Sequence, residues 1–329
     1  MHIAVTGSIA TDHLMRFRGR FRDSLVVDQL DKISLSFLVE DLEVRRGGVA
    51  ANIAFGMGCL GLRPVLVGAV GSDFVVDYRS WLNRHNVDTE AVHISDLRHT
   101  ARFVCTTDDD NAQIASFYAG AMSEARDIEL LPIADRLGRL DLTVISANDP
   151  EAMLRHTDEC RTRGYPFAAD PSQQLAWMDG DGIRLLVDGA AYLFTNEYEA
   201  ALLEQKTGWG AADVLDRVAV RVTTLGPRGA RVDRHGEPPI EVSAVDERRK
   251  ADPTGVGDAF RAGFLAGVGW GLSLERSAQI GALLATYVLE TIGTQEYEIG
   301  QARFLERLAK AYGSDAADEV APHLRCPRP

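Results

Sequence analysis

The most informative stretch of this chain is DPTGVGDAF, residues 252–260, which leads from a glycine-rich turn into a long apolar helix. Pro253 favours a turn, and Gly255 and Gly257 allow the backbone to approach a ligand closely. Asp258 follows in the first turn of the helix, where free N–H groups and the positive end of the helix dipole attract anions. Taken alone, the stretch fits an anion-binding turn and a turn with a capping aspartate about equally well.

A second glycine-rich stretch, GGVAANIA at residues 47–54, occurs early in the chain. Gly48 is expected to open a helix, and Asn52 then projects a polar side chain from an otherwise apolar helix. Considered by itself, this pattern is better explained by close packing of small residues between a helix and a sheet.

Around these two stretches, short β-rich apolar runs alternate with helical patterns. Several runs are apolar at almost every position, which is typical of strands covered on both faces. The alternation predicts an α/β fold with a central, mostly parallel sheet and helices on both faces. The expected strands are residues 3–7, 65–70, 142–146, 166–170, 192–195 and 218–225. The expected helices are residues 49–60, 74–86, 150–163, 196–206, 256–269, 274–291 and 302–312.

Two segments interrupt this alternation, at about residues 12–46 and 98–119. Both contain β-like runs, and the acidic residues 108–111 favour a hairpin tip over a calcium loop, because the glycine and glutamate of an EF-hand are missing. We expect a small sheet that forms a lid over the carboxyl ends of the main strands, where ligands bind in open α/β sheets. The whole chain, 1–329, is then one domain, with residues 314–329 expected to be a frayed tail.

The composition narrows the possible functions. The chain has 35 basic and 48 acidic residues, for a net charge of −13, and four of the basic residues are lysines. Nucleic acids and anionic membranes require a basic surface, so neither is an expected partner. We expect a cytoplasmic protein, because there is no secretory or membrane-spanning segment and the four scattered cysteines suit buried thiols. Walker-type phosphate loops, paired metal-binding histidines and the serine hydrolase elbow are absent from the sequence.

Together, residues 47–54 and 252–260 resemble the two signatures of the ribokinase-like (PfkB) family of sugar and nucleoside kinases. The resemblance covers nearly the whole chain, with both signatures in the family's order and spacing. It implies a three-layer α/β/α fold with a small β-sheet lid. Within the family the chain is most similar to adenosine kinases of the actinobacterial type, over residues 3–15, 100–102, 112–126, 168–174 and 221–227.

The resemblance implies transfer of the γ-phosphoryl group of ATP to the 5′-hydroxyl of adenosine, giving AMP and ADP. Asp258 would be the general base, and the backbone N–H groups of Gly255, Val256 and Gly257 would form the anion hole. Glu199 would help to hold Mg²⁺ through water, and K⁺ beside the 252–255 turn is a further activator that the family suggests. The ATP-binding residues would be Asn196, Thr224, Gly226, Gly229 and Thr254, and residues 293–295 would flank the adenine of ATP.

The resemblance also implies a nucleoside site. Asp12, Gly48 and Asn52 would bind the ribose, and Ser8, Ser36, Gln173 and Gln174 would bind the edge of the base. Phe103 and Phe117 would stack on the base; each alone fits lid packing as well, but their pairing on one hairpin beside two glutamines favours base recognition. Lids in the family often pair across a two-fold axis, so we expect a homodimer, with Phe117 serving its own site or that of the partner.

Two other functions are open at this point. One is a different kinase of the same family, such as a ribokinase or fructokinase, although a free sugar needs no aromatic stacking platform. The other is a non-catalytic nucleoside-binding protein, which would not require Asp258, the anion hole and the 196–199 segment together.

Overall fold

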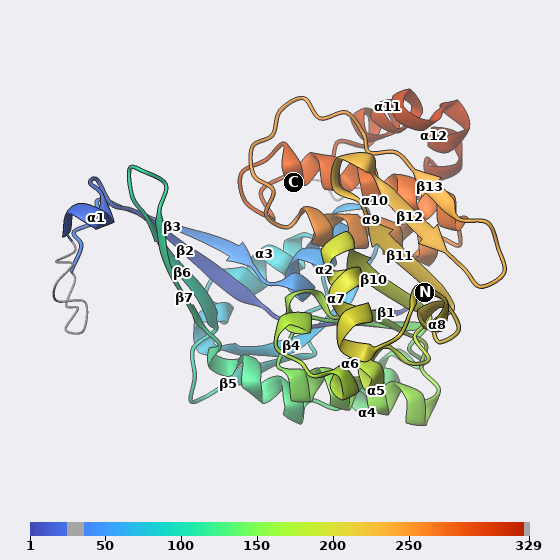
Figure 1. The fold of residues 1–329 in the computed structure, drawn as a ribbon, viewed down its shortest axis with the longest axis horizontal. Helices are drawn as coiled ribbons and strands as arrows, with labels where there is room; N and C mark the ends of the chain where they lie inside the picture. The colour runs from blue at the N-terminus through green and yellow to red at the C-terminus, as the bar shows by residue number, and fades with distance from the viewer. Residues whose placement is uncertain (25–35, 326–329) are drawn as a thin grey trace.

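The computed structural model describes residues 1–24 and 36–325. Its centre is a nine-stranded sheet in the order β13-β12-β11-β10-β9-β8-β1-β4-β5 (Figure 1). All neighbouring strands from β11 to β5 are parallel, and β12 and β13 continue the sheet in antiparallel pairing. The strands are β1 (Ile3–Thr6), β4 (Val65–Gly71), β5 (Val92–Ser95), β8 (Leu142–Ser146), β9 (Phe167–Asp170), β10 (Tyr192–Asn196), β11 (Val220–Thr224), β12 (Ala230–Asp233) and β13 (Ile240–Val242).

Helices cover both faces of this sheet, as the apolar strands predicted. Successive residues of β1 show why: Ile3 and Val5 belong to one buried cluster, whereas Ala4 between them belongs to another. The first cluster packs against α2 (Val49–Cys59), α3 (Tyr78–Arg84), α9 (Val256–Gly269), α10 (Leu274–Leu289), α11 (Gln301–Tyr312) and α12 (Ser314–Val320). The second packs against α4 (Leu131–Leu137), α5 (Pro150–Arg163), α6 (Gly180–Val187), α7 (Glu197–Thr207) and α8 (Ala211–Leu215). The predicted α/β/α class is confirmed.

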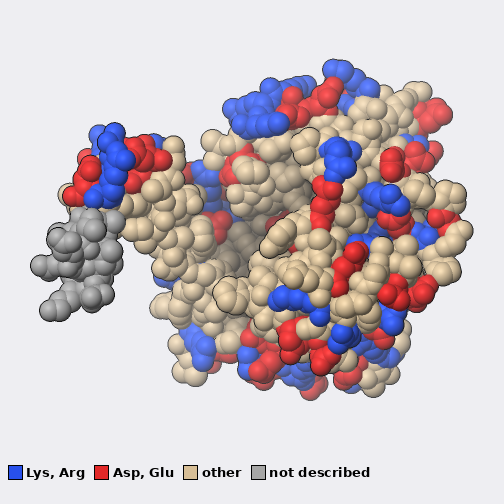
Figure 2. All heavy atoms as spheres, in the orientation of Figure 1, with Lys and Arg blue, Asp and Glu red and all other residues tan. Residues whose placement is uncertain are grey.

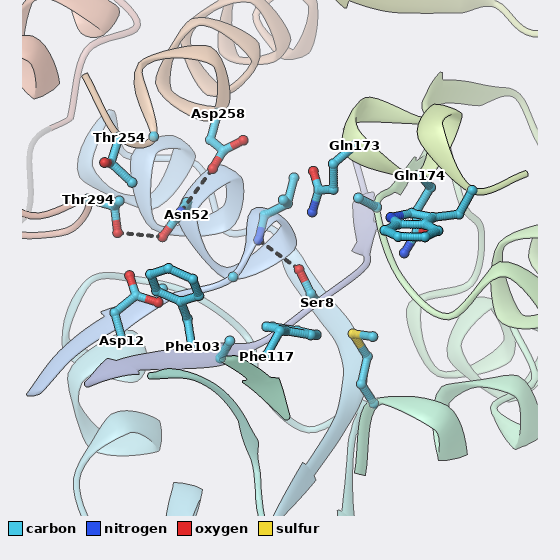
Figure 3. A pocket seen from close by; sticks show the side chains of 18 residues that line it. Ser8, Asp12, Asn52, Phe103, Phe117, Gln173, Gln174, Thr254, Asp258 and Thr294 are labelled. Carbon is cyan, nitrogen blue, oxygen red and sulfur yellow. Dashed lines mark hydrogen bonds between the residues drawn. The ribbon is translucent and has the colours of Figure 1, made fainter. Parts of the chain in front are cut away.

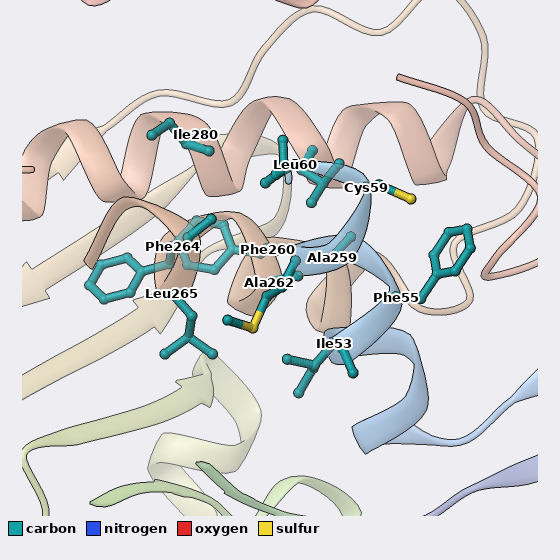
Figure 4. Packing of buried hydrophobic residues seen from close by; sticks show 14 of the residues in the cluster. Ile53, Phe55, Cys59, Leu60, Ala259, Phe260, Ala262, Phe264, Leu265 and Ile280 are labelled. Carbon is teal, nitrogen blue, oxygen red and sulfur yellow. The ribbon is translucent and has the colours of Figure 1, made fainter. Parts of the chain in front are cut away.

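Small residues let α2, α9 and α10 pack closely (Figure 4). A Cβ atom on Gly263 would lie 2.7 Å from the Cα atom of Gly281, and one on Gly56 would lie 2.7 Å from the Cβ atom of Ala262. Larger side chains at these positions would separate the helices. The close packing places the first turns of α2 and α9 next to each other, which is where the two glycine-rich stretches lie.

A second sheet of four strands, in the order β3-β2-β6-β7, forms the lid and extends from one side of the body (Figure 1). Its strands are β2 (Ala10–Arg16), β3 (Asp41–Gly47), β6 (Ala101–Thr107) and β7 (Gln113–Tyr118). The hairpin predicted at residues 108–111 is present. The Asp108 carboxylate accepts backbone N–H groups from Asp110, Ala112 and Phe21, the last of which begins the short helix α1 (Phe21–Ser24).

Two expectations were wrong. Residues 314–325 are not a frayed tail, because they form α12 and bury Ala316, Val320 and Leu324 against the core; residues 326–329 lie outside the described part of the chain. The helix expected over residues 74–86 is interrupted: a 3-10 turn, η2 (Ser72–Val75), precedes α3. None of the helices that the structure describes is long and apolar enough to cross a membrane.

Candidate active site

A pocket of about 540 Å³ lies between the lid and the carboxyl ends of the main strands. It is visible as a hollow beside the lid in Figure 2, in a surface where acidic and basic side chains are intermixed. Figure 3 shows Asp12, Phe103 and Phe117 on the lid side, facing Asn52 and Asp258 on the helix side. The expected residues that line it are Ser8, Asp12, Gly48, Asn52, Phe103, Phe117, Gln173, Gln174, Thr254, Gly255 and Asp258.

The first turn of α9 forms one end of the pocket. Gly255 is the N-terminal cap and adopts a φ of 75°, a conformation that favours glycine. The N–H groups of the residues that follow have no acceptor within the helix. That of Val256 makes a long hydrogen bond of 3.4 Å to the Pro253 carbonyl oxygen, which an anion could replace. Asp252 holds the turn in place, because its carboxylate accepts N–H groups from Thr254 (2.9 Å) and Gly293 (3.3 Å). These hydrogen bonds lower the pKa of Asp252, against the opposing effect of its burial.

Asn52 ties the two glycine-rich stretches together. Its Nδ2 donates to Asp258 Oδ2 at 2.9 Å, and its Oδ1 accepts from Thr294 Oγ1 and Gln295 Nε2, each at 2.9 Å. The two donors fix the amide orientation, so that its NH₂ group must face Asp258. Burial raises the pKa of Asp258, while the nearby Arg261 charge and the Asn52 hydrogen bond act in the opposite direction. The result is an oriented carboxylate in the first turn of α9, directly after the glycine-rich turn.

Residues 293–295 were expected to flank the adenine of ATP, and the structure shows what the side chains of Thr294 and Gln295 contact. Thr294 lines the pocket below the lid, and Gln295 is 1% exposed and donates to both Asn52 and Tyr78. These side chains are committed to orienting Asn52, which places them on the Asp258 side of the site. Sequence spacing could not show this, because 242 residues separate Thr294 from Asn52.

The residues expected to bind ATP lie at the same edge of the sheet. Asn196 and Thr224 are paired in register at the ends of the parallel strands β10 and β11. Gly226 begins the 3-10 turn η5 (Gly226–Arg228), and Gly229 follows it with a φ of 98°. A Cβ atom on Gly229 would lie 1.9 Å from the carbonyl oxygen of Val242, so only glycine fits. These four residues lie outside the pocket lining, whereas Thr254 lies within it.

Glu199 was expected near Mg²⁺. It forms a capping box at the start of α7: Asn196 Oδ1 accepts from Glu199 N, and Glu199 Oε2 accepts from Asn196 N, both at 2.8 Å. Its Oε1 is left as a hard carboxylate oxygen, the donor type that Mg²⁺ prefers. Within residues 1–24 and 36–325, no three His, Cys, Asp or Glu side chains converge as a metal cage. Glu199 thus offers one carboxylate oxygen of the type that Mg²⁺ prefers.

The lid contributes a carboxylate and two aromatic rings. Burial raises the pKa of Asp12 to about 6, against the opposing effect of the Arg45 charge. Phe103 and Phe117 are directly opposite each other on β6 and β7, and Phe117 is 55% exposed. Ser8 lines the pocket while its Oγ accepts the N–H of Val49 at 3.0 Å, which caps the start of α2.

Ser36 is the one predicted base-binding residue that the structure does not bring to the pocket. It is exposed and precedes β3, which begins at Asp41 opposite Arg16, the last residue of β2. Ser36 therefore lies beyond the far end of the lid strands.

Sequence reasoning missed Trp177, which lines the pocket but is 84% exposed. It follows the 3-10 turn η4 (Ser172–Ala176), which carries Gln173 and Gln174. In the sequence, Trp177 comes three residues after the predicted base-binding pair Gln173 and Gln174, and this spacing is the pattern that points to it. Asp170 and Arg261, which are buried beside Asp258 and Glu199, gave no signal in the sequence.

The comparisons with known proteins agree with this geometry. The model of the pfkB family of carbohydrate kinases matches residues 9–299. A nucleoside kinase of Burkholderia thailandensis, solved in complex with inosine, is 32% identical, with a TM-score of 0.81 over 94% of this chain and 98% of that one. The nucleoside kinase of Methanocaldococcus jannaschii is 27% identical over 86% of this chain and 92% of its own, and its crystal structure aligns with a TM-score of 0.82. The chain is therefore a member of the pfkB family of carbohydrate kinases.

Proposed function

We propose that this kinase transfers the γ-phosphoryl group of ATP to the 5′-hydroxyl of adenosine, forming AMP and ADP. The observation that carries the proposal is the arrangement of a single pocket. Asp258 and the first turn of α9 form one end, and Phe103, Phe117 and two glutamines line the region below the lid and beside η4. The first group suits phosphoryl transfer, and the second suits a flat base with polar edges.

At the reacting end, Asp258 would accept the proton of the 5′-hydroxyl. Burial raises its pKa, which makes the carboxylate a stronger proton acceptor than an exposed aspartate. Proton transfer can be late, because phosphoryl transfer has a loose transition state. The N–H groups of Gly255, Val256 and Gly257 would stabilise the charge on the transferring group. Glu199 would hold Mg²⁺ through water; the ion, when bound, neutralises charge on the phosphate oxygens.

At the ribose, Asp12 would accept hydrogen bonds from the 2′- and 3′-hydroxyls. A Cβ atom on Gly47 would lie 3.1 Å from Asp12 Oδ2, so glycine at this position leaves room for the carboxylate. Gly48 has a φ of 97° and lies against the Ser8 carbonyl, which brings the start of α2 close to the sugar position. Asn52 would contribute indirectly, by holding Asp258 toward the 5′-hydroxyl.

At the base, Gln174 favours adenine over hypoxanthine. Its Nε2 donates to the carbonyl oxygen of Asn148 at 2.7 Å, which fixes the amide orientation. The free Oε1 can then accept a hydrogen bond from the 6-amino group of adenine, whereas hypoxanthine has a carbonyl oxygen at that position. A broader nucleoside kinase remains the second candidate, because one relative was solved with inosine.

K⁺ beside the 252–255 turn stays a prediction from the family resemblance. Asp252, the carboxylate of the 252–255 turn, already accepts two backbone N–H groups and lies 3.8 Å from Arg45 Nη1. The proposed mechanism assigns this carboxylate to holding the turn and assigns K⁺ no step.

A homodimer formed through the lid sheets is part of the proposal. All six residues of β7 and the first four of β3 are exposed, including Leu42, Val44 and Ile114. Exposed sheet edges with apolar side chains favour pairing with another chain. Light scattering after size-exclusion chromatography tests this, and a stable monomer at assay concentrations would overturn it.

The activity is tested by a phosphorylation screen with ATP and Mg²⁺ over adenosine, inosine, guanosine, cytidine, ribose and fructose. We expect the highest kcat/KM for adenosine. A higher value for inosine or cytidine would replace adenosine kinase with a broader nucleoside kinase, and a higher value for a free sugar would overturn the nucleoside assignment.

A further inference from the structure

A buried cation lies beneath the first turn of α9. Arg261 is 6% exposed and comes three residues after Asp258 on the same helix. Its Nη2 lies 2.6 Å from Asp170 Oδ1 and 3.9 Å from Glu199 Oε2. Asp170 is the last residue of β9 and is 0% exposed. Segments far apart in the sequence therefore converge on one guanidinium.

The guanidinium reaches back to the anion-binding turn. Side chains on a helix lean toward its N-terminus, so that residue i lies over residue i−4. Here residue i−4 is Gly257, and a Cβ atom on Gly257 would lie 2.7 Å from Arg261 Nη1. A larger residue at 257 would force the guanidinium to move away from the turn. Glycine at 257 therefore leaves room for the guanidinium directly behind the turn.

We propose that Arg261 is a positioning residue that supplies a fixed positive charge behind the anion hole, with Asp170 as its anchor. The guanidinium stays protonated at all working pH values. It is enclosed by protein, where a charge acts on a nearby phosphoryl group more strongly than it would in water. Because Asp170 holds it in place before substrate binds, no reorganisation is needed during the reaction. This inference applies to any nucleoside substrate of the pocket.

The alternative role for Arg261 is purely structural: its charge would only neutralise buried acids and would not act on the phosphoryl group. Asp170, Glu199 and Asp258 all lie near this one cation, and each affects its pKa. Removing Arg261 alone would leave Asp170 buried without a counter-charge, which destabilises a protein in either case. Removing the charges of both Arg261 and Asp170 distinguishes a structural role of Arg261 from a role in the reaction. A neutral pair of similar size should restore stability, but it does not restore the positive charge behind the turn.

The experiment compares Arg261→Met, Asp170→Asn, the double variant and Arg261→Lys, using the nucleoside that the wild type phosphorylates best. We expect the double variant to regain thermal stability relative to Arg261→Met while kcat remains about tenfold to a hundredfold below wild type, with KM for the nucleoside little changed. Wild-type kcat in the double variant would overturn the proposal.

Two further variants make the result decisive. Arg261→Lys keeps the charge, so we expect a kcat well above that of the double variant; an equally low value would contradict the role of the charge. Arg221→Met is the matched control, because Arg221 is also buried and pairs with Glu204 at 2.8 Å, but near the start of β11. It should lower stability and leave kcat unchanged. If no nucleoside is phosphorylated by the wild type, the proposed function fails before this comparison begins.

Discussion

The ionised Asp12 side chain lowers the free energy of unfolding, and a substitution that removes its charge should raise it. Burial raises the pKa of this carboxyl from its ordinary 3.8 to about 6, which means that the folded protein holds the ionised form poorly. At 1.36 kcal/mol per pKa unit, the difference corresponds to about 3 kcal/mol at neutral pH. Because the side chain is partly exposed, solvent screening reduces the expected effect to about 1–2 kcal/mol.

The perturbation is Asp12→Asn, which removes the charge and keeps the shape. Below pH 3.8, Asp12 is protonated in both folded and unfolded chains and costs nothing. Between pH 3.8 and about 6 the unfolded chain ionises first, so wild-type stability falls as pH rises, and the full cost is present above pH 6. The variant should therefore be more stable than wild type at pH 7.5, by an amount that shrinks toward pH 4.5. It should also raise KM for the nucleoside.

Urea denaturation at pH 7.5, 6.0 and 4.5 measures this difference directly. Asp73 provides a control of opposite sign, because its hydrogen bonds to Thr100 and Arg102 lower its pKa. Asp73→Asn should therefore be less stable than wild type at pH 7.5. The reasoning is refuted if Asp12→Asn is less stable than wild type at pH 7.5, or if its effect does not depend on pH.

Three other predictions concern the pocket. Asp258→Asn should lower kcat by about a hundredfold to ten-thousandfold while nucleoside affinity, measured by calorimetry, changes little; retained activity would rule out the base. Phe103→Ala should weaken nucleoside binding by about five- to a hundredfold and leave ribose binding unchanged, whereas equal losses would exclude stacking. Trp177, which is 84% exposed, should change its fluorescence when nucleoside binds, and Trp177→Phe should abolish that change. Trp270→Phe is the control, because Trp270 stacks on His323; a signal that survives in Trp177→Phe would contradict the prediction.

Local patterns predicted much of the fold correctly, for reasons that the structure makes plain. The run at residues 142–146 is a strand buried along its whole length, and β8 has those same bounds. Residues 150–163 also form a helix with the predicted bounds, because Asp149 accepts the N–H of Ala152 at the start and Gly164 ends the helix with a φ of 70°. Both elements are specified by neighbouring residues, so a single sequence is enough to locate them.

Predictions that depended on distant partners were less accurate. The chain after residue 313 has polar residues and no long apolar run, yet it is ordered by burying Val320 and Leu324 in a cluster built from other helices. Ser36 was assigned to the base site, but the register of β2 and β3 places it beyond the far end of the lid strands. Neither burial against remote helices nor strand register can be read from nearby residues.

By itself, the sequence determined the α/β class, and its two glycine-rich stretches resembled the kinase family that the comparisons confirm. The class follows from periodicity, which is a local property of the chain. The family follows from the resemblance of residues 47–54 and 252–260 to its two signatures. Only the tertiary structure decided which side chains surround the turn at residues 252–257. Asn52 orients Asp258, and Thr294 and Gln295 orient Asn52. Arg261 lies behind Gly257. The reason is that each of these contacts depends on where helices and strands from distant parts of the chain pack together.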